Sequence, residues 1–422
     1  MAEIPSPGTV TFRDVFAVGE FRALFAAQLV SVAGDQLARV ALSILVFDRT
    51  GSPGWAALTY ALTFLPDLLG GPLLAGLADR HPRRTVMVAA DGARLLLMAV
   101  MALPGTPLPL LGVLLVGVQL LAAPWGAARA ALLPQVLPGE RFVVGTAVFT
   151  MTTQLAQVLG FATGGAIVAG LGPQGALGVN AVSFAVSALL VRYGIGHRPP
   201  PGCPGGNTAT PGTWCAQVRS GLVLVWADRR LRALVALACV SGFYIAGEAV
   251  AAPYAAAIGG GSMAVGALLA AYAVGNVLGM AVLARLPARW RTRLLVPLAI
   301  LACAALILCA TGPGLAWTMV VWVCSGAASA YNLTASTLFV QAVPDARRGQ
   351  AFGLAVTALR VSQGLGVVLA GVAAERIPPH QVVALAGVLG TAAAAAAGWS
   401  WRRSESPVAG SPQYRGDPAE AG

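Results

Sequence analysis

Twelve apolar stretches, each close to the length that an α-helix needs to cross a bilayer, constrain this chain more than any other feature. A membrane-spanning helix needs about 20 apolar residues, and short segments of glycine, proline and arginine separate the stretches. The stretches cover residues 22–47, 55–78, 85–103, 108–132, 143–171, 175–193, 231–254, 263–286, 294–311, 315–340, 350–374 and 381–401. The sequence therefore predicts an all-α integral membrane protein with twelve transmembrane helices.

Composition agrees with this prediction and excludes a soluble protein. Hydrophobic residues make up 57% of the 422 residues, charged residues only 10%, and the mean hydropathy is +0.76. In soluble domains about a quarter of the residues are charged. The net charge of +11 reflects 27 basic residues, all of them arginine, against 16 acidic ones, and most of the arginines fall between the apolar stretches. They are interpreted as topology determinants, so the expected partner is the lipid bilayer and not nucleic acid.

The positions of the arginines predict the orientation of the chain. Only Arg49 and Arg376 lie in loops on the side opposite the N-terminus. The loops on the N-terminal side hold Arg80, Arg83, Arg84, Arg141, Arg192, Arg198, Arg219, Arg229, Arg230, Arg285, Arg289, Arg291, Arg293, Arg347 and Arg348. Because basic loops stay in the cytoplasm, we expect both termini there, in a multi-pass protein of a bacterial inner (plasma) membrane. The N-terminus carries no pattern of a cleavable signal.

The longest polar break divides the twelve spans six and six. The predicted parts are a cytoplasmic N-terminal segment (1–21), a six-helix bundle (22–193), a cytoplasmic linker (194–230), a second bundle (231–401) and a disordered cytoplasmic tail (402–422). Within the linker, Trp214, Val218, Leu222 and Val225 have helical spacing. This indicates an amphipathic helix lying on the cytoplasmic membrane face, or alternatively a partner-binding helix.

The two halves also resemble each other. At a fixed offset of 206 residues, Gln135, Pro138, Arg141, Gln157, Gly160 and Gly165 recur as Gln341, Pro344, Arg347, Gln363, Gly366 and Gly371. A constant offset at equivalent loop and helix positions favours an internal duplication. A six-plus-six duplication predicts a central cavity between two bundles.

A charged motif follows the second apolar stretch. Gly76, Asp79 and Arg80, followed by Arg83 and Arg84, resemble the signature between the second and third transmembrane helices of the major facilitator superfamily. Further matches lie at Ser31, Gly34, Asp35, Pro66, Asp91, Arg94, Pro134, Gln135, Pro138, Gly221, Leu222, Leu231 and Arg232. Together they resemble the exporter branch that includes macrolide-efflux and enterobactin-export proteins.

The resemblance implies a rocker-switch transporter that moves amphipathic small molecules outward against proton entry. It also implies that Asp79 caps the start of the eleventh helix near residues 349–352 and so closes the cytoplasmic side. Asp91 and Arg94, near the cytoplasmic end of the third span, are expected to belong to the same gate around Arg80. A monomer is expected.

Ionisable residues inside the spans are functional hypotheses, because an unpaired charge in lipid costs several kcal/mol. Asp35, Asp67 and Glu248 are the candidates for proton coupling, and Arg39 and Arg360 for charge tuning or substrate binding. Asp35 and Arg39 have i, i+4 spacing, which predicts a pair on one helix face, either a titrating site or a permanent structural pair.

The other candidates leave alternatives open. Glu248 has no basic neighbour on its own helix, so it is either a proton carrier or a solvated acid near the outer surface. Asp67 follows Pro66 and either shares the proton role or pairs with Arg39. Arg360 either neutralises an acid across the cavity or binds an anionic substrate group.

Polar and aromatic side chains within the spans are candidates for the cavity lining. They are Gln28, Gln119, Trp125, Gln154, Phe243, Tyr244, Asn276, Tyr331, Asn332 and Gln363. The alternative is that they pack the helices against one another. The six cysteines form no close pairs and are expected to be free thiols. The three histidines are dispersed, so neither a metal site nor another cofactor is predicted.

The sequence contains no enzyme signature, and without lysine it has no phosphate-binding GxxxxGK[ST] motif. It predicts a secondary active transporter that exports a small amphipathic molecule, such as a drug, antibiotic or siderophore, by proton antiport. The alternatives are a proton-coupled importer or uniporter of the same fold, and a transport-inactive membrane sensor.

Overall fold

The computed structural model describes residues 11–64, 81–198, 225–312, 314–343 and 348–405, except the side chains of 348–350, 404 and 405. Within these ranges all regular structure is helical. The first half contains α1 (Phe12–Phe16), α2 (Gly19–Thr50), α3 (Pro53–Ala61), α6 (Arg83–Met101), α7 (Leu108–Val136) and α8 (Glu140–Gly194). The second half contains α10 (Arg229–Cys239), α11 (Ser241–Tyr244), α12 (Ala246–Ala249), α13 (Ala251–Ala257), α14 (Ser262–Arg285), α15 (Ala288–Ile307), the 3-10 helix η1 (Leu308–Thr311), α16 (Leu315–Ser329), α17 (Tyr331–Ala342), α18 (Arg348–Ala374) and α19 (Pro379–Glu405).

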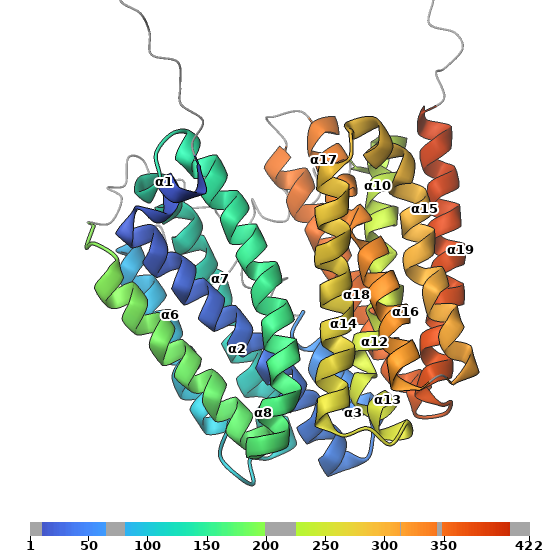
Figure 1. Cartoon of the computed structure of the whole chain (residues 1–422), viewed down its shortest axis with the longest axis horizontal. Helices are drawn as coiled ribbons and strands as arrows, with labels where there is room; N and C mark the ends of the chain where they lie inside the picture. The colour runs from blue at the N-terminus through green and yellow to red at the C-terminus, as the bar shows by residue number, and fades with distance from the viewer. Residues whose placement is uncertain (1–10, 65–80, 199–224, 313, 344–347, 406–422) are drawn as a thin grey trace, which may run out of the picture.

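The helices form two groups that stand side by side (Figure 1). One group contains α1, α2, α6, α7 and α8, and the other contains α10 and α14 to α19. The helix α3 crosses to the second group, where it packs on α18. The start of α1 and the end of α19 lie at the same end of the molecule, as an even number of spans requires.

Described helices fall in each of the twelve predicted spans, in the second only as α3, because residues 65–80 are outside the described ranges. Eight helices in the described ranges are long and apolar enough to cross a membrane. The range of α8 contains two helices, the fifth and sixth spans, which meet at Gly172, where φ of 71° and ψ of 170° are not helical. The seventh span is divided into α10 to α13, and Pro253, which lacks an N–H group, removes one helical hydrogen bond there. The tenth is divided into α16 and α17.

Two helices extend beyond the spans predicted from the sequence. The helix α2 begins at Gly19, inside the segment predicted to be a cytoplasmic extension. Likewise α19 continues to Glu405, so residues 402–405, predicted to start a disordered tail, are helical. In both cases the helix extends beyond the apolar stretch because its backbone hydrogen bonds do not require apolar side chains outside the lipid.

The repeated glycines make equivalent contacts within the two halves. Gly160 of α8 lies against the backbone of Ala33 in α2, and its counterpart Gly366 of α18 lies against the backbone of Gly242 in α11. A Cβ atom at either glycine would come within 3.0 Å of backbone atoms, where no side chain can yield. The first helix of each half therefore packs closely on the fifth through a position where only glycine fits.

A second pair of repeated glycines joins the two halves. Gly165 of α8 abuts Gly266 of α14, and its counterpart Gly371 of α18 abuts Ala57 of α3. These contacts lie near the ends of the helices farthest from α1 and from the end of α19. At the same end, the backbone N–H of Gly54 donates a hydrogen bond of 2.8 Å to Glu375 Oε1. Closely packed glycine contacts thus hold this end of the molecule together.

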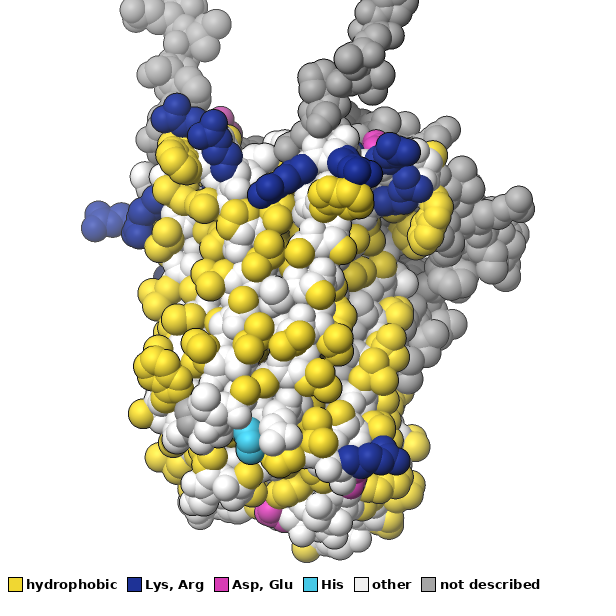
Figure 2. Space-filling model, turned by 90° about the vertical axis from the view of Figure 1, so that its right-hand side faces the viewer, with side chains coloured by type: hydrophobic (Ala, Val, Ile, Leu, Met, Phe, Trp, Pro, Cys, Tyr) yellow, Lys and Arg dark blue, Asp and Glu magenta, His cyan; other side chains and the backbone are white. Residues whose placement is uncertain are grey.

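The outer surface suits a bilayer. Large apolar side chains are exposed along the spans, among them Leu96, Val113, Met151, Leu189 and Leu369. Figure 2 shows an apolar band on the side that carries α15 and α19, with basic side chains gathered at the end where the described chain begins and ends. This agrees with the arginine asymmetry in the sequence and with a multi-pass membrane protein.

Several predictions fall outside the described residues. They concern Asp67, the motif residues Gly76, Asp79 and Arg80, and the linker helix up to residue 224. Cys239, Cys303, Cys309 and Cys324 are free, as predicted, whereas Cys203 and Cys215 are not described.

Candidate functional site

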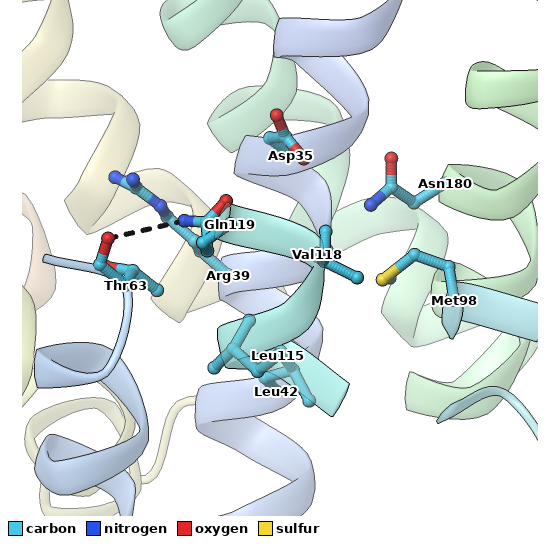
Figure 3. Close-up of a pocket in the computed structure, with 10 residues that line it drawn as sticks. Asp35, Arg39, Leu42, Thr63, Met98, Leu115, Val118, Gln119 and Asn180 are labelled. Atoms are coloured by element: carbon cyan, nitrogen blue, oxygen red, sulfur yellow. Dashed lines mark hydrogen bonds between the residues drawn. The ribbon is translucent and has the colours of Figure 1, made fainter. Parts of the chain in front are cut away.

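Asp35 of α2 forms an ion pair with an arginine of another helix. Its Oδ2 lies 2.8 Å from Nη2 of Arg94 in α6, and the Arg94 side chain is only 3% exposed. The Arg94 guanidinium also stacks on the Phe184 ring, 4.0 Å from the ring centroid. The predicted pair of Asp35 with Arg39 is therefore wrong. Arg94 reaches the carboxylate from α6, and the Asp35 and Arg39 side chains leave α2 in different directions (Figure 3).

Asp91 extends this network into the interior of the first half. It is fully buried, and it accepts hydrogen bonds from Trp125 Nε1 at 3.0 Å and from Ser187 Oγ at 2.6 Å. Its Oδ1 lies 3.7 Å from Arg94 Nη1. The described partners of Asp91 and Arg94 thus lie inside the bundle, whereas Arg80, around which the gate was predicted, is outside the described residues. Trp125, a predicted cavity residue, is instead a buried donor to this network.

Glu248 lies where the two halves meet. It belongs to α12, is 5% exposed, and accepts a hydrogen bond from the hydroxyl group of Tyr60 in α3. The guanidinium of Arg39 lies 5.7 Å from the centroid of the Tyr60 ring. The alternative of a solvated surface acid is therefore wrong. A change in the charge of Glu248 acts directly on a contact between the two halves.

A small pocket of about 20 Å³ lies beside Asp35 and Arg39. Asp35, Arg39, Gln119 and Asn180 contribute its polar lining, and Gln119 Nε2 lies 3.5 Å from the Thr63 carbonyl oxygen (Figure 3). A space of this size accommodates about one water molecule. The Asp35 side chain is 23% exposed, so its carboxylate remains accessible to water while it is paired with Arg94.

Several predicted cavity residues form a polar layer in the middle of the molecule. Gln154 of α8 donates to Asn276 of α14 at 2.6 Å, across the two halves. In the second half, Asn332 donates to the hydroxyl group of Tyr244 at 2.6 Å. The remaining predicted residues in this layer are Gln28, which contacts Thr153, and Gln363, which accepts a 3.1 Å hydrogen bond from Arg360 Nη1.

Two predicted cavity residues instead pack helices together. Tyr331 is fully buried and donates to the backbone carbonyl of Leu237 at 2.7 Å. Phe243 packs on the apolar core of the second half. Of the predicted gate residues, Arg83 donates to the carbonyl of Ala131 at 2.8 Å, and Arg84 is half-buried. In the described ranges no three His, Cys, Asp or Glu side chains form a cluster suited to a metal ion.

The sequence analysis missed Arg129 and Tyr60. Arg129 lies in α7, seven residues before the helix ends, where an arginine within an apolar stretch is itself a signal. Tyr60 carried no such signal, since only the fold brings its hydroxyl group to Glu248.

The family model of the Major Facilitator Superfamily matches residues 24–257 and 234–420. Among curated relatives, the multidrug efflux pump Tap of Mycobacterium tuberculosis is 30% identical over 253 residues, which cover 55% of this chain and 57% of Tap. The chain therefore spans little more than half the length of that relative. Macrolide efflux protein A of Streptococcus pyogenes is 32% identical over 72 residues, covering 17% of this chain and 18% of that protein.

Solved structures agree on the fold. The nucleoside transporter NupG superposes with a TM-score of 0.72 at 11% identity, covering 92% of this chain and 100% of that one. A bacterial homologue of the lysosomal transporter Spinster gives a TM-score of 0.63 at 17% identity, covering 92% and 93%. With the family model matching nearly the whole length, the chain belongs to the Major Facilitator Superfamily.

Proposed function

We propose that the protein is a secondary active exporter of a small amphipathic molecule, driven by proton antiport across a bacterial inner membrane. The names of its relatives Tap and macrolide efflux protein A support export of drug-like compounds. The arginine-rich end of the molecule faces the cytoplasm in this proposal, because basic loops remain inside. In the described state the halves are joined at the opposite end, so substrate enters from the cytoplasm or the inner leaflet.

One observation carries the proton-coupling part of the proposal. The buried carboxylate of Glu248 in one half accepts the hydroxyl hydrogen of Tyr60 in the other. An ionised carboxylate accepts a stronger hydrogen bond than a neutral one, so protonation weakens this contact between the halves. A proton can drive alternating access only if the two conformations bind it with different affinity. A titratable group in the contact between the halves meets that condition.

Asp35 is the second coupling candidate. Its ion pair with Arg94 lies within one half, so its protonation would change the packing of α2 on α6 and not the contact between halves. Its partial exposure gives it access to water, which Glu248 lacks in this state. The two acids therefore have different roles in this proposal, with Asp35 exchanging protons and Glu248 coupling them to movement.

Transport into inside-out vesicles tests the proposal. A pH gradient, acidic inside, should drive uptake of dyes and macrolide-type compounds by the wild-type protein. Glu248→Gln and Asp35→Asn should abolish the gradient-dependent part at unchanged protein levels. Glu140→Gln is the matched control, because Glu140 is an exposed carboxylate in the first turn of α8.

Three outcomes would contradict the proposal. Uptake that ignores both the gradient and the two substitutions would indicate facilitated diffusion. Gradient-driven movement in the opposite direction would indicate an importer. A membrane sensor would be indicated if no compound were taken up and if the protein's function in cells required the 194–230 linker but neither Glu248 nor Asp35.

A further inference from the structure

Arg129 of α7 lines a cavity in the first half. The cavity has a volume of about 210 Å³ and lies between α7 and the first turns of α8. One guanidinium nitrogen, Nη1, donates to Gln28 Oε1 at 2.9 Å. The guanidinium carbon lies 4.9 Å from the Phe149 ring centroid and 5.9 Å from that of Trp125. These contacts hold the arginine in place on two aromatic rings and one amide.

Within the described ranges no carboxylate neutralises Arg129. The ion pairs found there are Arg94 with Asp35 and Asp91, and Arg198 with Glu20. The buried acids already have donors of their own: Asp35 from Arg94, Asp91 from Trp125 and Ser187, and Glu248 from Tyr60. Arg129 uses one of its five N–H groups on Gln28, and none of its nitrogens is both buried and unsatisfied, so the others face the cavity.

The rest of the cavity lining determines what else the ligand must present. Leu133, Phe142 and Phe149 provide apolar surface. The hydroxyl groups of Thr146, Thr150 and Thr153 donate to backbone carbonyls of α8, so Arg129 supplies the donors for an anion. A planar guanidinium with free donors binds a carboxylate in a bidentate manner, and the aromatic rings contact the adjoining apolar group.

We propose that this cavity is a binding subsite for the transported molecule and that Arg129 binds an anionic group of the carboxylate class attached to an aromatic or aliphatic body. The inference rests on the proposed function, because it assigns the substrate class of the same transporter. An anionic lipid headgroup presents the same chemistry, so the experiment must separate the two sources.

A matched pair of probes tests the subsite by binding alone. The full-length protein is placed in nanodiscs of zwitterionic lipid, and the affinities of 2-naphthoate and of neutral 2-naphthamide are compared. The wild-type protein should bind naphthoate about tenfold more tightly, as one charge-assisted interaction predicts. Arg129→Gln should remove that preference, and Arg129→Lys should keep part of it. Arg289→Gln, at an exposed arginine of α15, should leave the preference unchanged.

Thermal unfolding of each variant in the same discs shows whether it is folded, and the amide affinity shows whether the cavity is intact. Equal affinities of wild-type protein for naphthoate and naphthamide would overturn the proposal, and so would a preference that Arg129→Gln retains. Displacement of naphthoate in proportion to added phosphatidylglycerol would assign the subsite to lipid and overturn the substrate assignment. Binding is measured without a gradient, so failure of vesicle transport with an intact naphthoate preference would count against the exporter proposal alone.

Discussion

The contact of Gly165 with Gly266 predicts how a single methyl group shifts the conformational equilibrium. A Cβ atom at Gly165 would lie 2.6 Å from the carbonyl oxygen of Ser262 and 3.1 Å from the Cα of Gly266. Both are backbone atoms of the segment that begins α14, so no side chain can rotate away. To restore ordinary contact distances, α8 and α14 must separate by about 1 Å. Gly165→Ala therefore penalises the described state, in which this end is closed.

The size of the shift follows from the cost of overpacking. Inserting one methyl group into a close contact costs about 1–3 kcal/mol. That corresponds to a change of about 5- to 150-fold in the ratio of the two conformations. Alanine also favours a helix over glycine by roughly 1 kcal/mol, but this gain is the same in both conformations and cancels. Gly170→Ala in the same helix is the matched control, because its added Cβ atom meets nothing within 4 Å.

Distances between spin labels measure the effect. In a cysteine-free background, labels at Leu171→Cys and Met263→Cys, both exposed positions, report the separation of α8 and α14. Gly165→Ala should enlarge the population at long distance, and Gly170→Ala should match the parent protein. If the two variants have the same distance distribution, the contact does not control closure and the reasoning is refuted.

Three further predictions concern single contacts. In thermal unfolding, Arg94→Met should destabilise the protein by about 3–5 kcal/mol, because it leaves Asp35 and Asp91 without their cation. Adding Asp35→Asn to this variant should recover part of the lost stability. Gly172→Ala should lower the free energy of unfolding by about 1–3 kcal/mol in the same assay, because φ of 71° is strained for alanine. Gly178→Ala is the control and should cause no such loss, because its added Cβ atom meets nothing within 4 Å. The Ser52 hydroxyl group and the Gly54 N–H lower the pKa of the Glu375 carboxyl below its ordinary value of 4.5. The Glu375 contact is therefore complete above pH 4.5 and lost as the pH falls through the lowered pKa, and the spin labels should then separate. Distances that stay unchanged over an acid titration carried through that pKa would contradict this.

Much of the fold is predictable because lipid imposes strict requirements on a sequence. Each span must be apolar over a bilayer's thickness, so the helices can be counted from hydropathy alone. The described breaks at Gly172 and Pro173 also follow from residue type. The divisions of the seventh and tenth spans were not predicted, because the apolar stretch runs through each of them without a polar break.

The candidate site is less predictable, and Asp35 illustrates why. Its i, i+4 spacing from Arg39 describes one helix, whereas its actual partner, Arg94, is 59 residues away on another. Spacing along a helix defines a shared face but not which neighbouring helix supplies a charge to that face. The same limit applies to Glu248, whose lack of a basic neighbour on its own helix says nothing about Tyr60.

The sequence by itself determined the membrane class, the number of spans, the end that carries the arginines, and the duplicated glycines at which helices approach closely. These are properties of single segments or of a fixed offset, so they follow from local composition and pattern. Only the tertiary structure decided that Gly165 and Gly371 join the halves, that Asp35 pairs with Arg94, and that Glu248 meets Tyr60. Those pairings depend on the positions and rotations of whole helices, which arise from packing over the entire bundle.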